Sequence, residues 1–136
     1  MNKLKGKIVN IQSEENISLV DIKVGNQVFR ALVLETRETS PFLMVGNYVY
    51  ILFKETEVSI GKNIKGNISL SNRIPCTVWK IKKGKILSQL ELVFEDIKIV
   101  SIITTSSLER LGIKEGDSVE AFIKANEVSI MEMLNE

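Results

Sequence analysis

Apolar and polar residues alternate along most of this chain with the period of two that is typical of β-strands. Stretches of this kind, bounded by glycine or polar residues, predict five short strands in each half of the chain. The predicted strands are 6–11, 17–24, 27–34, 48–54, 57–60, 75–81, 86–94, 97–103, 118–124 and 127–131. Hairpin turns are expected at Gly25-Asn26 and at 83–85, because glycine accepts the positive φ that such turns need.

The two halves repeat one pattern at a fixed distance. The motif K-x-x-E-V-S-I begins at Lys54 and again at Lys124, 70 positions later, and the same offset relates Gly46 to Gly116. A constant offset between the halves predicts a tandem duplication. We therefore expect a first domain at 1–60, a linker at 61–68 and a second domain at 69–136. Each domain is predicted to be a small all-β Greek-key barrel with one short helical turn between its third and fourth strands.

Composition argues against several classes of function. The 136 residues carry 18 Lys and Arg against 17 Asp and Glu, so no broad charge favours a nucleic acid or a membrane as partner. With no histidine and one cysteine, Cys76, we expect neither an enzyme nor a metal held by direct side-chain ligation. Cys76 is expected to be a small buried side chain. No apolar run suggests a signal peptide or a membrane span, so a cytoplasmic protein is expected.

One stretch concentrates hydroxyl groups. Thr104-Thr105-Ser106-Ser107 precedes Leu108-Glu109-Arg110-Leu111-Gly112, a pattern that predicts a short helix with a capping box from Ser106 to Glu109 and with Gly112 after its end. Hydroxyls and backbone N–H groups at such a place are able to hold a small oxyanion. An ordinary capped helical turn is the alternative interpretation of the same residues.

Three segments in the second half resemble one known family. They are Ser69-Leu70-Ser71-Asn72-Arg73-Ile74-Pro75, the stretch 104–116, and Lys124-Ala125-Asn126-Glu127-Val128. In order and spacing they are similar to the molybdenum-pterin-binding (Mop) domain of the molbindins, which is related to TOBE domains. The resemblance implies tandem OB-like Greek-key β-barrels that exchange strands. It is strong over 68–131 and weaker over 1–60.

The resemblance also implies an oxyanion site between domains or subunits. It assigns Ser69, Lys124 and the backbone of Ala125 to one side, and Thr104 and Ser107 to the other. Secondary candidates are Ser71, Asn72, Arg73 and Lys54. The chain departs from the family pattern because Ser71 stands where the family has an arginine and Cys76 where it has a glycine. We expect either weaker binding or compensation by Arg73.

The first half lacks most of these groups. The offset of 70 puts Leu34 at the position of Thr104, Arg37 at that of Ser107 and Glu55 at that of Ala125. A carboxylate near the site would repel an anion. We expect the first repeat to be mainly structural, with a divergent site formed by residues 36, 37, 39 and 40 as the alternative.

Together with these observations, the resemblance implies a cytoplasmic molybdate or tungstate carrier that stores or buffers the anion. By resemblance it is a homo-oligomer, with a trimer favoured and a dimer possible. One alternative is a regulatory or docking module of a molybdate transporter or regulator. A lower alternative is binding of single-stranded nucleic acid, for which Trp79-Lys80-Ile81-Lys82-Lys83-Gly84-Lys85 is the candidate segment. We expect neither nucleic acid nor membrane as a partner.

Overall fold

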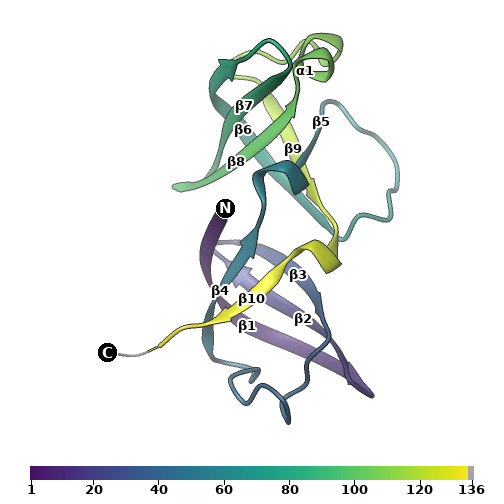
Figure 1. Cartoon of the computed structure of the whole chain (residues 1–136), viewed down its shortest axis with the longest axis vertical. Helices are drawn as coiled ribbons and strands as arrows, with labels where there is room; N and C mark the ends of the chain where they lie inside the picture. The colour runs from purple at the N-terminus through teal and green to yellow at the C-terminus, as the bar shows by residue number, and fades with distance from the viewer. Residues whose placement is uncertain (135–136) are drawn as a thin grey trace. The chain divides into compact units, whose positions relative to one another are not determined.

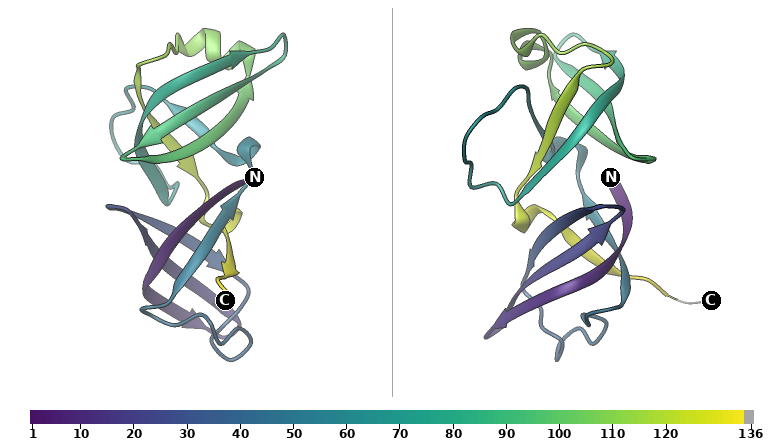
Figure 2. Two further views of the ribbon diagram at one scale, coloured as in Figure 1. Left: turned by 90° about the vertical axis from the view of Figure 1, so that its left-hand side faces the viewer. Right: turned by 180° about the vertical axis from the view of Figure 1, so that it is seen from behind.

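The computed structural model describes residues 1–134 as two compact units, each built around one antiparallel five-stranded sheet (Figure 1). Unit 1 comprises Met1–Phe53 and Lys124–Glu136, and unit 2 comprises Lys54–Ile123. Both sheets are strongly twisted and curl around their cores (Figure 2). The all-β prediction is confirmed.

Unit 1 contains a sheet with the strand order β10-β4-β1-β2-β3. Its elements are β1 (Asn2–Glu14), β2 (Ile17–Val24), β3 (Gln27–Val33), β4 (Tyr48–Phe53), the 3-10 turn η2 (Ala125–Glu127) and β10 (Ser129–Glu132). Alternate residues of these strands point inward, and Ile8, Ile22 and Ile51 are fully buried. The rings of Phe29 and Phe53 stack in this core with their centroids 6.1 Å apart.

Unit 2 contains a sheet with the strand order β5-β9-β6-β7-β8. Its elements are the 3-10 turn η1 (Glu55–Glu57), β5 (Ser59–Gly61), β6 (Asn72–Lys83), β7 (Leu87–Phe94), β8 (Ile97–Thr104), the helix α1 (Thr105–Leu111) and β9 (Ser118–Ile123). Aliphatic side chains of four strands fill the core. They include Ile74, Leu90, Leu92, Ile99 and Ile123.

The elements recur with the offset of 70 that the sequence predicts. β2 and β7 correspond along their whole length, and the long first strand of each sheet has a bulge at the same place, between Ile8 and Asn10 in β1 and between Val78 and Lys80 in β6. Beside each bulge, the N–H of a glycine donates a hydrogen bond to a carbonyl of the bulged strand. Gly46 N lies 2.8 Å from the Ile8 oxygen, and Gly116 N lies 2.7 Å from the Val78 oxygen. The φ of Gly46 is +99° and that of Gly116 is +94°, which explains why both positions carry glycine.

The last strand of each repeat belongs to the other repeat's sheet. β5 pairs with β9, and β10 pairs with β4, in matching register: Ser59 lies opposite Phe122, and Ser129 lies opposite Leu52. The compact units therefore differ from the expected ranges 1–60 and 69–136. A strand's pattern of buried and exposed residues does not reveal which sheet it joins, so the repeats of the sequence and the compact units of the fold need not coincide.

Two local expectations need correction. The first repeat has turns and bends at 34–47 in place of the expected helical turn, so α1 occurs in the second repeat alone within residues 1–134. The final strand of each repeat begins two residues later than predicted, because a 3-10 turn occupies 55–57 and 125–127. Within the described residues, no helix is long and apolar enough to cross a membrane.

Candidate functional site

The hydroxyl-rich stretch forms the junction between β8 and α1. Thr104 ends the strand with extended backbone (φ −68°, ψ 145°), and its Oγ1 accepts a hydrogen bond from the Ser107 N–H at 3.1 Å. The predicted capping box from Ser106 to Glu109 is therefore wrong. Because β8 stays paired with β7 through Thr104, the helix starts directly after it, two residues before the expected position. Gly112 ends the helix with a φ of +63°, as predicted.

The Thr104 and Ser107 side chains contact each other at this junction. Thr104 Oγ1 donates to Ser107 Oγ at 2.9 Å, and Arg110 Nη2 donates to the same oxygen at 3.1 Å. Both lone pairs of Ser107 Oγ are thus engaged, which leaves its proton to donate to a ligand. Thr104 is exposed and Ser107 is half-buried. Arg110 was not among the predicted site residues, although its spacing of three residues from Ser107 on a helix was the available signal.

Buried hydroxyls hold the junction in place. Thr105 Oγ1 lies 2.7 Å from Ser88 Oγ and donates to the Gly84 carbonyl at 2.8 Å, so it fixes the start of α1 to the β6–β7 hairpin. Thr105 is 4% exposed and Ser88 is 1% exposed. The four consecutive hydroxyl residues therefore have different roles: Thr105 is structural, while Thr104 and Ser107 form an accessible pair.

Lys124 and Ala125 begin the part of the chain that completes unit 1. Lys124 has extended backbone (φ −68°, ψ 144°) before η2, and its carbonyl accepts a hydrogen bond from the Glu127 N–H at 3.0 Å. Its side chain is exposed. Ala125 is half-buried in η2, which packs on β3 within unit 1.

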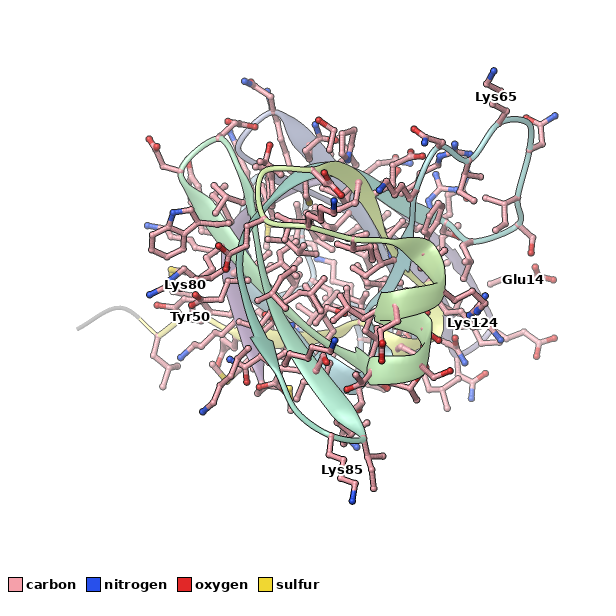
Figure 3. All side chains as sticks on the ribbon, turned by 90° about the horizontal axis from the view of Figure 1, so that it is seen from above. Glu14, Tyr50, Lys65, Lys80, Lys85 and Lys124 are labelled. Atoms are coloured by element: carbon pink, nitrogen blue, oxygen red, sulfur yellow. The ribbon has the colours of Figure 1, made fainter. Side chains whose placement is uncertain are left out.

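Ser69 lies in the irregular segment 62–71 that connects β5 to β6, and it is exposed. Side chains near the two ends of this segment fasten it. Lys62 Nζ donates to the Gly112 carbonyl at 2.9 Å and lies 3.1 Å from Asp117 Oδ2. Arg73 donates to the Ile64 carbonyl at 2.8 Å and to the Gly66 carbonyl at 3.1 Å. Lys65 projects from the outer part of the segment (Figure 3).

Two of the secondary candidates have structural contacts. Asn72 is fully buried and donates from Nδ2 to the Ile123 carbonyl at 3.1 Å. Arg73 forms a two-pronged ion pair with Glu120, in which Nη2 lies 2.9 Å from Oε1, and this hydrogen bond holds the pKa of the Glu120 carboxyl below its usual value. The other donors of this guanidinium are directed at the carbonyls of residues 64 and 66, so its contacts in this structure all lie within unit 2. Ser71 is exposed.

The corresponding region of the first repeat has a different arrangement. Leu34, at the position of Thr104, is 75% exposed. Ser40 donates to the Glu35 carboxylate, and Thr39 Oγ1 caps the local turn by accepting from the Thr36 N–H at 3.0 Å. The backbone N–H of Lys54 donates to Glu57 Oε1 at 2.8 Å. The hydroxyls and carboxylates of this region are engaged with each other or with the backbone, and the nearby carboxylates are unfavourable for an anion.

The structure thus brings Thr104, Ser107 and Arg110 together and fastens the segment that carries Ser69 to the same unit. Lys124 and Ala125 are placed at the start of η2. Among residues 1–134, no group of three or more Asp, Glu, His or Cys side chains could hold a metal ion. The chemistry of the accessible set is that of hydrogen-bond donors, which suits a ligand that accepts hydrogen bonds.

Comparisons with known proteins agree with this chemistry. Residues 68–130 match the TOBE domain model. The chain is 39% identical over 67 residues to molybdenum-pterin-binding protein 3 of Clostridium pasteurianum, an overlap of 48% of this chain and 97% of that protein. It is 28% identical over 113 residues to the molybdenum import ATP-binding protein ModC of Brucella abortus (strain 2308), which covers 82% of this chain but 30% of that protein.

A solved structure resembles nearly the whole chain. It is a crystal structure of the cytoplasmic molybdate-binding protein ModG with molybdate bound, which covers 96% of this chain and 94% of its own at 27% identity with a TM-score of 0.89. This agreement includes the first repeat, which lies outside the segment matched by the TOBE model. The chain therefore belongs to the Mop/TOBE family of molybdenum-pterin-binding proteins and contains two Mop domains in tandem.

Proposed function

We propose that this chain is a cytoplasmic molybdate-binding protein, not an enzyme, that stores or buffers molybdate or tungstate. The observation that carries the proposal is the agreement along 96% of the chain with ModG, which is described as cytoplasmic and was solved with molybdate bound. The Clostridium pasteurianum relatives, which are named as molybdenum-pterin-binding proteins, support it.

The proposed ligand set is Ser69, Thr104, Ser107, Lys124 and the backbone N–H of Ala125. Molybdate is a dianion whose oxygens accept hydrogen bonds, so its site needs donors and little negative charge. Ser107 meets this need because Thr104 and Arg110 occupy its lone pairs and orient its proton outward. Each hydrogen bond to a charged oxygen contributes about 1.5–3 kcal/mol. The helix α1 has seven residues, so hydroxyl groups and lysine, rather than a helix dipole, supply most of the attraction.

We propose that the protein works as a homo-oligomer, with a trimer favoured over a dimer. The reason is that barrels of this size bury modest cores and gain stability by closed association. The first repeat serves mainly as scaffold, because its hydroxyls pair with carboxylates and backbone.

Calorimetric titration with molybdate in excess sulfate tests the function, with the molar mass measured in parallel. Saturable binding with a fixed number of anions per oligomer is expected. Lys124→Ala should weaken binding by at least about tenfold, the effect of losing one charged donor, while Lys54→Ala serves as the matched control and should change it little. Equal losses from both variants would contradict the asymmetry between repeats, and no heat with either molybdate or tungstate would contradict the function.

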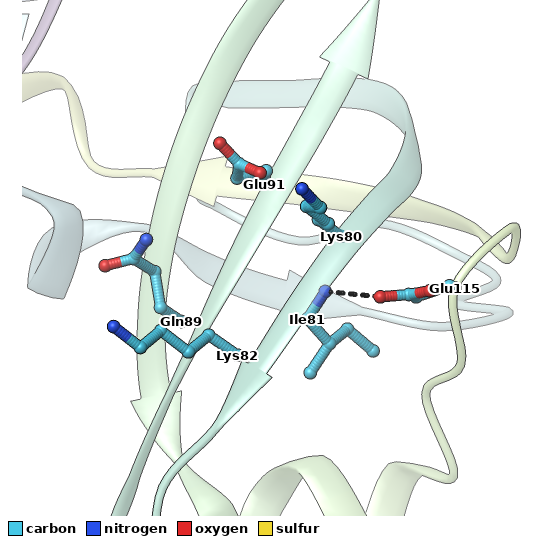
Figure 4. Close-up of a pocket in the computed structure, with 6 residues that line it drawn as sticks. All are labelled: Lys80, Ile81, Lys82, Gln89, Glu91 and Glu115. Carbon is cyan, nitrogen blue, oxygen red and sulfur yellow. Dashed lines mark hydrogen bonds between the residues drawn. The ribbon is translucent and has the colours of Figure 1, made fainter.

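A docking role on a transporter is the second candidate, because the match to ModC spans 82% of this chain. It predicts that the chain associates with a molybdate transporter ATPase and binds molybdate weakly or not at all. The nucleic-acid candidate segment fits less well. Lys80 and Lys82 share a shallow pocket with Glu91 and Glu115, whose carboxylate accepts from the Ile81 N–H at 2.9 Å (Figure 4). Two carboxylates beside two lysines do not favour a phosphate backbone.

A further inference from the structure

One face of the unit 1 sheet gathers positive charge and aromatic rings. Alternate residues of β1 point outward there, and they are joined by neighbours on β2 and β4 in register: Lys7 lies opposite Lys23 on one side and opposite Tyr48 on the other. We call this surface the lysine face. It consists of Lys3, Lys5, Lys7, Lys23, Tyr48 and Tyr50.

The tyrosine rings hold the lysine side chains over the sheet. Lys3 Nζ lies 4.3 Å from the ring centroid of Tyr50, and Lys5 Nζ lies 5.3 Å from that of Tyr48. Lys7 Nζ lies 6.0 Å from the Tyr48 ring as well. Such cation–π contacts restrain long side chains that otherwise move freely in solvent. Three ammonium groups are therefore arranged in advance along one strand.

Carboxylates do not neutralise this charge. Within residues 1–134, none of the four lysines has a carboxylate oxygen within 4.0 Å, whereas other bases on the same sheets do. Arg30 engages Asp21 on β2 at 2.8 Å, and Lys98 in unit 2 is paired with Glu91 at 3.1 Å. Like charges directly opposite each other, as in Lys7 and Lys23, destabilise a sheet. A bound anion would relieve this repulsion.

Apart from Lys3, whose counterpart is the basic residue Arg73, the lysine face is specific to the first repeat. The offset of 70 places Pro75 at the position of Lys5, Thr77 at that of Lys7 and Val93 at that of Lys23. Tyr48 corresponds to Ser118, and Tyr50 to Glu120. The barrel architecture alone therefore does not require these lysines and tyrosines. The repeat that lacks the hydroxyl pair therefore carries a basic face that its counterpart does not share.

We propose that the lysine face docks an acidic segment of a partner protein. Alternate residues of a strand lie about 6.8 Å apart, the same spacing as alternate carboxylates of an extended peptide. Lys5, Lys7, Lys23 and Tyr48 also line a shallow pocket that would receive one carboxylate. A short acidic segment fits better than a nucleic acid, because the ammonium groups occupy the ring faces on which bases would stack.

The test uses a fluorescent peptide with glutamate at every second position and measures its anisotropy with the full chain at low and high salt. The peptide should bind, and binding should weaken as salt rises. The triple variant Lys3→Gln, Lys5→Gln, Lys7→Gln should lose at least about tenfold in affinity. The matched control is Lys80→Gln, Lys82→Gln, Lys98→Gln, which removes the same charge from unit 2, where Lys80 and Lys98 lie over the Trp79 ring. It should change affinity less than about twofold.

Three kinds of outcome would overturn the proposal. The first is failure of the peptide assay, seen either as no saturable binding at low salt or as equal losses in both triple variants. The second is tighter binding of oligothymidylate than of the peptide, which would assign the face to single-stranded nucleic acid. The third is a fall in the oligomer mass of the Lys3, Lys5, Lys7 variant, which would assign the face to another copy of this chain. Molybdate titration of each variant tests the proposed oxyanion function separately, because no lysine of the face belongs to the proposed oxyanion site.

Discussion

At the scale of single residues, the direction of one proton decides what the hydroxyl pair is able to bind. Ser107 Oγ accepts from Thr104 and from Arg110, so its own proton is directed away from both. Arg110 also brings a positive charge to the proposed anion site, whose only other charged donor is Lys124. Arg110 is therefore a positioning residue for the proposed ligand set.

Arg110→Gln should weaken molybdate binding by about tenfold, because Ser107 loses a charged donor that orients it. Arg110→Lys should recover part of the loss. The measurement is calorimetric titration, and the control is Lys85→Gln, which removes the same charge at the tip of the β6–β7 hairpin (Figure 3). Unchanged affinity in Arg110→Gln, with the fold intact by circular dichroism, would remove Arg110 from the site.

Cys76 provides a pH-dependent prediction. Burial raises the pKa of its thiol to about 12, and the thiol donates to the Ile74 carbonyl at 3.3 Å. Because the folded pKa is raised, the stabilising contribution is complete below the unfolded value near 9 and is lost as pH rises toward 12. The chain should lose stability over this alkaline range, and Cys76→Ala should lose less. Denaturant unfolding at a series of pH values measures both, and identical pH profiles would contradict the prediction.

The same residue illustrates what the sequence could predict. Cys76 was expected to be a small buried side chain because the chain has no histidine to activate a thiol, and the structure confirms the burial. Thr104 and Ser107 were found as a pair because the family motif fixes their spacing. The structural roles of Asn72 and Arg73 were not predictable, because their partners, Ile123 and Glu120, come from β9, which is distant in sequence.

At the scale of elements, the segment 62–71 combines irregular backbone with two strong attachments. Lys62 ties its start to the end of α1, and Arg73 ties its middle to β9 through Glu120. In the sequence, Ser69 lies between Lys62 and Arg73, the two residues that make these attachments. The position of Ser69, a proposed hydrogen-bond donor to molybdate, thus depends on Lys62 and Arg73, which the proposed ligand set does not include.

Glu120→Gln should loosen this segment, because Arg73 loses its charged partner. Limited proteolysis within 62–71 should become several-fold faster, and molybdate affinity should fall, while the midpoint of thermal unfolding changes little. The Arg73 hydrogen bond lowers the pKa of Glu120, so this contribution is present above the ordinary carboxyl pKa and is lost as pH falls through the lowered value. Unchanged proteolysis would show that the attachment does not fasten the segment. Glu91→Gln, which breaks the pair with Lys98, is the control.

Most strands were predictable because alternation, turn glycines and the constant offset agree. β2 has the predicted boundaries, and the Gly25 turn joins it to β3. The boundaries of α1 were missed because strand pairing continued through Thr104 and overrode the local capping signal. β1 and β6 extend beyond their predicted ranges because their charged ends, such as Lys3 and Lys83, are tolerated on an exposed face.

At the scale of the whole molecule, each compact unit is completed by a strand from the other repeat. β10 covers the edge of β4, and β5 covers the edge of β9. An uncovered edge presents unpaired backbone groups that recruit other strands. The fold therefore requires both repeats, although each repeat contains a full set of five strands.

A chain that ends at Glu127 should lack β10 and self-associate through the exposed edge of β4. The control is a chain that ends at Glu132, which keeps β10 and should behave like the full chain. Light scattering after size-exclusion chromatography measures the difference. Equal masses and equal thermal stability for the two chains would show that β10 is dispensable for unit 1.

The exchange of strands also sets an order of events during translation. As the chain leaves the ribosome, β1 to β4 emerge first, yet unit 1 stays incomplete until Ser129–Glu132 has been synthesised. Unit 2, which begins later in the sequence, obtains its last strand earlier, at Ser118–Ile123. Unit 1 thus starts first and is completed last. The outer edge of β4 stays unpaired while more than half of the protein is synthesised. During that interval, β4 could pair with the β10 segment of another chain that is being synthesised on a neighbouring ribosome. The spacing of ribosomes and the rate of elongation would then influence whether the repeats exchange strands within one chain or between two.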